Sequence, residues 1–188
     1  MNALAQPGLA RVHALYAGLV ADRAFLDTAP LGASGPAMEA ATLLNAEARL
    51  LDRRQFDTWF GLWDPDAAFW VPLHGDFHPA ADQALLLDDH RRLRERVWRM
   101  HDPSAWALQP PPQVVRLVGS VEAWEVGDDE LLATSAIAFT HERLQQVLRL
   151  SGRQIHRLRR TPDGLRIVRK ILLSPDITAG TPHLGWLL

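Results

Sequence analysis

Residues 113–174 read QVVRLVGSVEAWEVGDDELLATSAIAFTHERLQQVLRLSGRQIHRLRRTPDGLRIVRKILLS, and this stretch decides the fold. Its apolar and β-branched runs predict four strands, at about 113–126, 131–141, 145–159 and 164–174. The turns Gly127-Asp128-Asp129 and Thr161-Pro162-Asp163-Gly164 separate them, because proline pre-sets φ and glycine accepts a positive φ. Strands joined this closely are antiparallel neighbours, since a parallel return needs a crossover of a dozen residues or more.

Helical periodicity replaces this pattern in the first third of the chain. Spacings of three, four and seven predict an amphipathic helix over 9–26, on the apolar positions Leu9, Val12, Leu15, Leu19 and Leu26. The turn-rich segment 31–36 is a predicted linker, and a second helix is expected from Met38 to Leu51. A further helical turn carries Phe56, Trp59, Phe60 and Trp63, and Asp64-Pro65 is expected to close it.

The middle of the chain mixes both patterns. Residues 67–73 predict a short strand, which Pro72 would confine to a sheet edge or a bulge. A loop holding His74 and His78 follows, and 88–100 reads as another amphipathic helix, rich in arginine. Pro103 and the triplet at 110–112 then indicate an extended connection.

Helices first and a long-stranded meander last indicate the α+β class. A strongly curved sheet wrapped around the N-terminal helices would form a cone with an apolar mouth. The chain has 188 residues, of which 47% are hydrophobic, and this suits one compact core. We expect an N-terminal helix and linker at 1–36, followed by one domain at 37–188.

Composition excludes several classes of function. The chain has no cysteine, so it cannot supply the thiolates of an iron–sulfur cluster or a cysteine-ligated zinc site. Its net charge of −2 gives no field for holding nucleic acid or an anionic membrane. No signal peptide or membrane-spanning run is evident, so a cytoplasmic location is expected.

Four short sequence segments resemble segments of one protein family, and they occur along the chain in the same order as in that family. They are Glu47–Asp52 followed by Phe56-Asp57 and Trp59; Phe69-Trp70-Val71-Pro72; Asp88-Asp89 with Leu93 and Arg96-Val97; and Ala105-Trp106-Ala107 with Pro110-Pro111. The chain from about Met38 onward is similar to the small (β) subunits of aromatic-ring-hydroxylating dioxygenases, within the NTF2-like (SnoaL-like) superfamily. It departs from that family at 112–116, where the family usually has a serine, then arginines and a histidine.

The resemblance implies a fold, a role and partners. The expected fold is the NTF2-like cone, with N-terminal helices packed in a strongly curved antiparallel or mixed sheet. The expected role is that of a non-catalytic assembly subunit, with no cofactor of its own. The large (α) subunit would hold a Rieske [2Fe-2S] cluster and a mononuclear iron, and the small subunits would form a homotrimer within an α3β3 assembly. Electrons would arrive from NAD(P)H through reductase and ferredoxin partners.

Several polar groups were weighed as catalytic or metal-binding sites. His74, Asp76 and His78 are the ligand types of a mononuclear iron, although Gly75 and Pro79 favour a plain polar loop. His101-Asp102 has the residue types of an acid–base pair, but it also suits a helix end. His141 and His156 lie on predicted strands, where each is expected to be exposed or satisfied by a neighbour. We name no catalytic or metal-binding residue.

Aromatic and charged residues suggest where the chain contacts itself and its partners. Trp59, Phe60, Trp63 and Trp70 are expected in one apolar cluster on the concave face of the sheet, and Trp98 also fits a core position. Subunit contacts are expected at Arg96, Arg99, Trp106, Arg116 and Trp186.

Two other functions stay open at this point. A stand-alone NTF2-like dehydratase or isomerase would hold an acid–base pair in the cone, such as His101 with an aspartate. A binding protein for a small apolar ligand would need an open, dry mouth. Cone folds host unrelated functions, so architecture does not decide between these classes.

Overall fold

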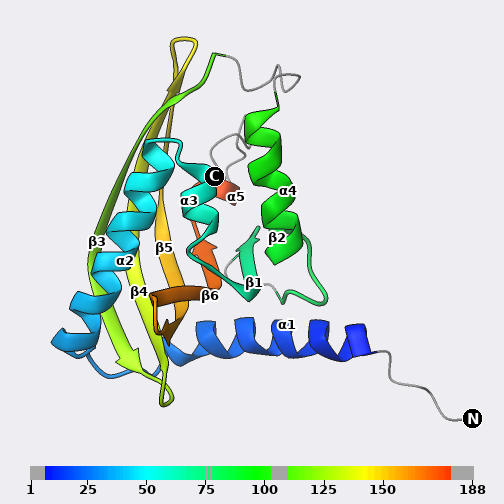
Figure 1. The fold of residues 1–188 in the computed structure, drawn as a ribbon, viewed down its shortest axis with the longest axis vertical. Helices are drawn as coiled ribbons and strands as arrows, with labels where there is room; N and C mark the ends of the chain where they lie inside the picture. Colours follow the sequence, from blue (N-terminus) through cyan, green and yellow to red (C-terminus); the bar gives the residue numbers. More distant parts are fainter. Residues whose placement is uncertain (1–6, 75, 77, 103–109, 179–188) are drawn as a thin grey trace, which may run out of the picture.

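The computed structural model describes residues 7–74, 76, 78–102 and 110–178. Within these ranges the chain forms five helices and six strands (Figure 1): α1 Pro7–Phe25, α2 Ser34–Asp52, α3 Phe56–Phe60, β1 Trp63–Pro72, β2 Ala84–Asp89, α4 His90–His101, β3 Gln113–Glu125, β4 Glu130–Arg143, β5 Gln146–Thr161, β6 Gly164–Leu173 and α5 Pro175–Thr178.

All six strands belong to one mixed sheet, in the order β2-β1-β6-β5-β4-β3. The four predicted C-terminal strands are confirmed, and each pairs antiparallel with its sequence neighbour. β1 pairs antiparallel with β2 and parallel with β6. The long excursion through β2 and α4 therefore separates β1 from the meander, and the α+β prediction is confirmed.

Register shifts bend the sheet into a strongly curved surface. They fall between Val71 and Pro72, between Gly119 and Glu122, and between Arg157 and Leu158. Each leaves backbone unpaired and increases the local twist, so the strands curl around the helices. Pro72 lies at one of these bulges, as its missing N–H requires, although β1 has partners on both sides.

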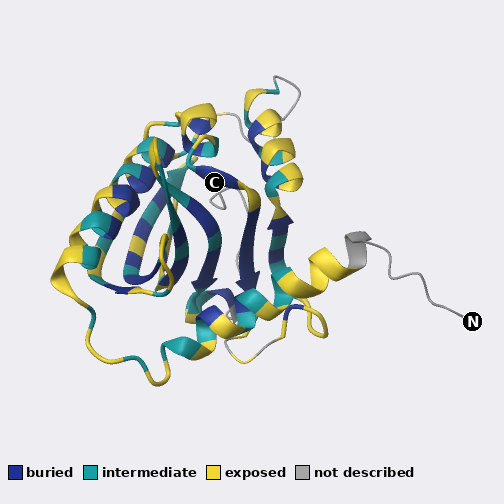
Figure 2. Ribbon diagram, turned by 60° about the horizontal axis from the view of Figure 1, so that its bottom comes forward, coloured by how far each residue is buried: buried dark blue, intermediate teal, exposed yellow. Residues whose placement is uncertain are grey.

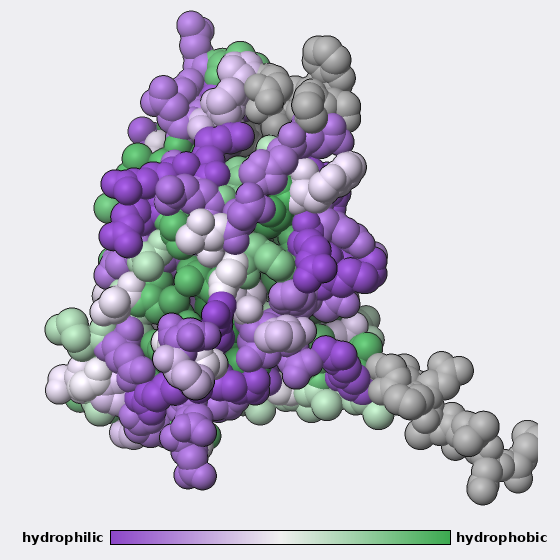
Figure 3. All heavy atoms as spheres, viewed as in Figure 1, coloured by the Kyte–Doolittle hydropathy of each residue, from purple (hydrophilic) through white to green (hydrophobic). Residues whose placement is uncertain are grey.

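The main core fills the concave side of the sheet. Helices α2, α3 and α4 cover this side (Figures 1 and 2), and they contribute Leu43, Trp59 and Leu93 to a cluster with Phe69 and Leu158. Trp59 and Trp63 meet edge to face with ring centroids 5.4 Å apart. The side chains of α2 and α4 that face outward in Figure 3 are mainly hydrophilic, with hydrophobic atoms visible between these helices.

A second, smaller cluster lies on the convex side. Here Leu19 of α1 packs with Trp70, Ile155 and Ile171. The expectation that Trp70 shares the concave cluster with Trp59, Phe60 and Trp63 is therefore wrong. Residues 69 and 70 alternate along β1, and because the sheet is buried on both faces, the two aromatic rings enter different cores.

Two other local predictions are corrected. Asp64-Pro65 does not follow a helix that reaches Trp63, because α3 ends at Phe60 and β1 already begins at Trp63. The expected loop before α4 contains strand β2, whose last residue, Asp89, caps α4 by accepting from Arg92 N at 2.9 Å. Trp98 is 65% exposed on α4 and is not a core residue.

None of the described helices combines the length and the apolar composition that a bilayer-spanning helix needs.

Candidate functional site: the interior and the outer face of the cone

Three ionisable side chains meet inside the cone, between α2 and the sheet. Glu47 of α2 lies 2.7 Å from Lys170 of β6, measured from Oε1 to Nζ, and 3.4 Å from His156 of β5, measured from Oε2 to Nε2. All three are buried, and His156 is 0% exposed. Trp59 Nε1 also donates to Glu47 Oε1, at 3.2 Å. We call Glu47, Lys170 and His156 the interior ion cluster.

Strand register explains why Lys170 and His156 face the same carboxylate. Lys170 pairs with His156 on one side and with Phe69 on the other. Directly paired residues point to the same face of a sheet, and Phe69 belongs to the concave core. The Lys170 ammonium lies 5.3 Å from the centroid of the Phe69 ring, so an aromatic face and a carboxylate share its charge.

The surroundings set the charge of each member. Burial raises the pKa of Glu47, but Lys170 and His156 outweigh it and hold this pKa well below its usual range. Burial lowers the pKa of His156, and Glu47 only partly offsets this effect. Burial likewise lowers the pKa of Lys170 against the pull of Glu47. At neutral pH the carboxylate is therefore ionised and the imidazole is neutral.

A second, part-buried ion pair lies close by. Arg116 of β3 donates to Asp52 of α2 from Nη1 at 2.6 Å and from its backbone N at 3.0 Å. Its guanidinium lies 5.8 Å from the Phe139 ring centroid, and its side chain is 5% exposed. Burial lowers the pKa of Arg116, with Asp52 opposing the shift. The contacts of Glu47 and Asp52 thus hold the C-terminal part of α2 against the sheet.

This arrangement suits a structural role, in which α2 is held against the sheet, better than it suits acid–base catalysis. A general base needs a free lone pair within reach of a substrate proton. Glu47 Oε1 already accepts from Lys170 and Trp59, and Oε2 faces His156. Neither of the two cavities described below is lined by any of these residues.

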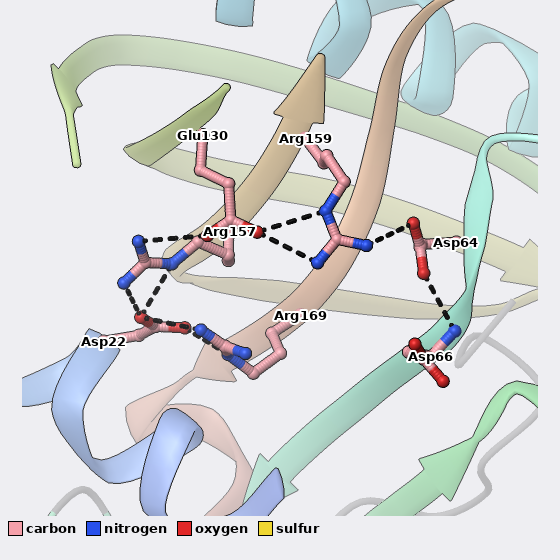
Figure 4. A network of polar contacts seen from close by, with 7 residues as sticks. All are labelled: Asp22, Asp64, Asp66, Glu130, Arg157, Arg159 and Arg169. Atoms are coloured by element: carbon pink, nitrogen blue, oxygen red, sulfur yellow. Dashed lines mark hydrogen bonds and ion pairs between the residues drawn. The ribbon is translucent and has the colours of Figure 1, made fainter. Parts of the chain in front are cut away.

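A separate network fixes α1 to the convex face (Figure 4). Asp22 of α1 is 1% exposed and accepts from Arg157 Nη2 and from Arg169 Nε, both at 2.5 Å. Arg159 continues the network, because it donates to Glu130 at 3.0 Å and to Asp64 at 2.9 Å. The carboxylate of a helix outside the meander thus forms ion pairs with two arginines of neighbouring strands, one of which also pairs with Glu130.

Two cavities open on the outside of the cone. One, of about 730 Å³, lies between α1, the start of β1 and the start of α4, and its lining includes Arg11, Asp66 and His90. The other, of about 310 Å³, is a groove over β3, β4 and β5, and its lining includes Val115, Leu117 and Arg149.

The expected subunit-contact residues have different surroundings. Arg96 forms an ion pair with Asp88 within the chain. Arg99 is exposed on α4, where its Nε donates to Glu95 O at 3.4 Å. Arg116 is the buried partner of Asp52 described above. Trp106 and Trp186 lie outside the described residues. A role of these five residues in subunit contacts stays a prediction.

The histidines considered from the sequence do not gather at one site. His101 Nε2 lies 3.1 Å from Asp57 Oδ2, but the two side chains are 51% and 81% exposed. His78 Nδ1 accepts from Ala80 N at 3.1 Å in a local turn. Within the described ranges, no group of three or more histidine, aspartate or glutamate side chains is arranged to hold a metal ion.

Sequence reasoning missed the interior ion cluster. Glu47 was noted only within a family-like string, and His156 was expected to be exposed or satisfied by a neighbour. The structure contradicts the first alternative, because His156 is 0% exposed; its Nε2 lies 3.4 Å from Glu47 Oε2, and neither ring nitrogen has a hydrogen-bond partner among the described residues. His141 is also buried, at 1% exposed.

Comparison with known proteins gives consistent sequence matches. Residues 46–177 match the family described as "Ring hydroxylating beta subunit". The chain is 33% identical over 148 residues to the small oxygenase component of the p-cumate 2,3-dioxygenase system of Pseudomonas putida, covering 77% of this chain and 82% of that protein. It is 26% identical over 147 residues to the 2-halobenzoate 1,2-dioxygenase small subunit of Burkholderia cepacia, covering 74% and 89%.

Solved structures show the same fold. A chain of naphthalene 1,2-dioxygenase with indole bound matches with a TM-score of 0.73 and 22% identity, over 83% of this chain and 87% of that one. An NTF2-like protein with a cystatin-like fold from Novosphingobium aromaticivorans matches with a TM-score of 0.54 and 16% identity, over 79% and 85%. The NTF2-like cone is thus confirmed, and with the family match over most of its length, this chain belongs to the β subunits of ring-hydroxylating dioxygenases.

Proposed function

We propose that this chain is the non-catalytic assembly subunit of an aromatic-ring dioxygenase, working with a large oxygenase subunit. The family match over residues 46–177 carries this proposal. A Rieske cluster takes two cysteine thiolates as ligands, and this chain has no cysteine. The cluster and the mononuclear iron that activates O₂ would therefore belong to the large subunit.

The interior of the cone supports an assembly role. In an NTF2-like enzyme this space would hold a base that a substrate can reach. Here Glu47 Oε1 accepts from Lys170 and Trp59, the pKa of Glu47 is held well below its usual range, and Glu47 lines neither of the two described cavities. The ion cluster instead fixes α2 against the sheet, and a rigid cone is what a base for other subunits requires.

The proposed assembly is a homotrimer of this chain within an α3β3 complex in the cytoplasm. Repeated identical contacts close most often into cyclic symmetry, and the family resemblance sets the number at three. The substrate is an aromatic ring compound bound in the large subunit. The relatives named above belong to oxygenases named for different compounds, p-cumate and 2-halobenzoate.

The test combines assembly with turnover. Light scattering of the chain expressed alone should give a trimer, and co-expression with its large subunit should give equal amounts of both. Turnover of aromatic substrates should require the large subunit. A strictly monomeric chain that transforms a substrate unaided would overturn both the assembly and the non-catalytic role.

A further inference from the structure

One part of the convex sheet face is left open by the described elements. Helix α1 covers the part of this face around Asp22, Arg157 and Arg169. Farther along the same strands, Val115 and Leu117 of β3 are 62% and 68% exposed. These fractions are large for aliphatic side chains on the face of a sheet.

Register defines this open area as three rows of three residues. The direct pairings run across β3, β4 and β5, as Val115–Thr140–Arg149, Leu117–Ala138–Ser151 and Gly119–Ala136–Arg153. A Cβ added at Gly119 would meet nothing within 4 Å, which confirms that this end of the area is open. We call these nine residues the outer platform.

The outer platform has the shape of a trough with two different walls. Small residues on β4 form its floor, and the 310 Å³ groove described above lies along it. Val115 and Leu117 make an aliphatic wall on one side. Arg149 and Arg153 make a cationic wall on the other, and both are exposed.

Arg149 and Arg153 form no ion pair within the described part of the chain, and the carboxylate of Asp176, which lines the same groove, accepts from Ser151 N at 2.7 Å. Every other arginine or lysine on β5 and β6 has a carboxylate within 4.0 Å: Arg157, Arg159, Arg160, Arg166, Arg169 and Lys170. Among the described residues, Arg149 and Arg153 have no such partner. Arg153 donates only to the Thr134 hydroxyl, at 3.4 Å. Two cations beside an exposed aliphatic row call for an acidic and apolar surface opposite them.

We propose that the outer platform is the docking surface for the large oxygenase subunit, which inserts an aliphatic side chain beside Leu117 and places carboxylates opposite Arg149 and Arg153. This inference rests on the proposed function. A two-fold contact between two platforms would set like charges against each other. Most carboxylates of this chain already accept from its own arginines or amides, so a foreign chain is the better source of the missing anions.

The experiment uses the full chain and the large oxygenase subunit that the proposed function assigns to it as partner. The double variant Arg149→Glu/Arg153→Glu reverses the cationic wall, and Leu117→Asp disrupts the aliphatic wall. The matched control, Arg49→Glu/Arg53→Glu, reverses two exposed arginines near the end of α2 that make no described side-chain bond. Affinity for the large subunit, thermal midpoint and oligomeric state of the lone chain are measured for each.

Both platform variants should keep the thermal midpoint and oligomeric state of the unmodified chain and lose at least about tenfold in affinity for the large subunit. Added salt should weaken the unmodified complex more than the complex of the charge-reversed variant. Undiminished affinity in both platform variants would overturn the docking site and leave the proposed function intact. Dissociation of the lone chain's oligomer would also overturn it, because the platform would then contact a second copy.

A separate result bears on the proposed function. If the unmodified chain does not bind the large subunit at all, the proposed function fails, and the docking site fails with it. Replacing Asp128 and Asp129, exposed acids at the β3–β4 turn, with asparagine tests the second-copy alternative directly. An unchanged oligomer and unchanged affinity in that variant are expected.

Discussion

Lys170 Nζ lies 2.7 Å from Glu47 Oε1, and 123 residues of chain separate the two. Their side chains are 5% and 4% exposed, so both charges are removed from water. Desolvation of this kind is costly, and it is offset only when each charge keeps its partner. The pair therefore makes the docking of α2 onto β6 depend on both residues at once.

Removing one partner should be far more damaging than removing an exposed ion pair. We expect Lys170→Met to lower the free energy of unfolding by about 3–5 kcal/mol, because Glu47 would keep a buried, uncompensated charge. Arg91→Met is the control, since its pair with Glu95 is exposed on α4 and should contribute about 0–1 kcal/mol. Urea unfolding measures both. Losses of equal size in the two variants would contradict this view of the interior ion cluster.

A double variant separates the charge from the packing. Glu47→Leu combined with Lys170→Met removes both charges and keeps apolar volume, so it should recover part of the loss seen in Lys170→Met alone. No recovery would mean that the length of the lysine chain, not its charge, holds α2 in place.

The four C-terminal strands could be predicted because turn-forming residues and apolar runs mark them in the sequence. The burial of Lys170 and His156 depends on contacts with residues far away in the sequence. Gly164 takes φ +111° at the turn where proline and glycine predicted one. Lys170 and His156, by contrast, look in sequence like ordinary strand residues facing solvent. One signal was available: residues 167–172 carry apolar side chains on both sides of Lys170, which indicates a strand buried on both faces. The partner on α2 could not be read from any local pattern.

Acid should destabilise the protein through His156. Its folded pKa is lowered by burial from an ordinary value of 6.5, so the unfolded chain takes up a proton that the folded chain resists. Stability is then lost as pH falls below about 6.5. Glu47 acts in the same direction at lower pH, because its folded pKa is also lowered, from 4.5. The charged neighbours of the imidazole are Glu47 and Lys170.

The measurement is the urea midpoint between pH 8 and pH 5. His156→Gln should flatten this dependence relative to the unmodified chain, and His13→Gln, at an exposed position of α1, is the control for replacing a histidine. Identical slopes in the unmodified chain and His156→Gln would show that the buried imidazole does not resist protonation.

The tryptophans of the described residues include both buried and exposed positions, and this gives a direct comparison. Trp59 is 1% exposed and bonded to Glu47, so Trp59→Ala should cost roughly 3–5 kcal/mol. Trp98→Ala, at a side chain that is 65% exposed, should stay within about 0.5 kcal/mol. Chemical unfolding of both variants tests the assignment, and a large loss in Trp98→Ala alone would contradict it.

The positions of the aromatic residues could be predicted from the sequence only in part. Trp59, Phe60 and Trp63 were placed correctly in the concave core, because helical spacing and a following strand direct them to one side. Trp70 was predicted on the wrong face of the sheet. A strand that is buried on both faces lacks the alternation of polar and apolar residues that would show which side chains face the concave core.

Asp22 should control how firmly α1 is held. Its carboxylate is buried and bonds Arg157 and Arg169, whereas Asp27, just past the same helix, is exposed and makes no described side-chain bond. Asp22→Asn keeps the shape but removes the charge. It should cost about 1.5–3 kcal/mol, the range for hydrogen bonds to charged groups, and Asp27→Asn should cost almost nothing.

Limited trypsin cleavage within α1 is the measurement for this last prediction. Helix α1 is held to the sheet by the Asp22 ion pairs and by the small cluster around Leu19, so weakening the ion pairs should favour local opening of this helix. Because each 1.4 kcal/mol changes an equilibrium about tenfold, cleavage after Arg11 or Arg23 should be at least about tenfold faster in Asp22→Asn. Cleavage inside β4 or β5 should stay slow. Equal rates in Asp22→Asn and Asp27→Asn would show that apolar contacts around Leu19, and not the two arginines, hold the helix.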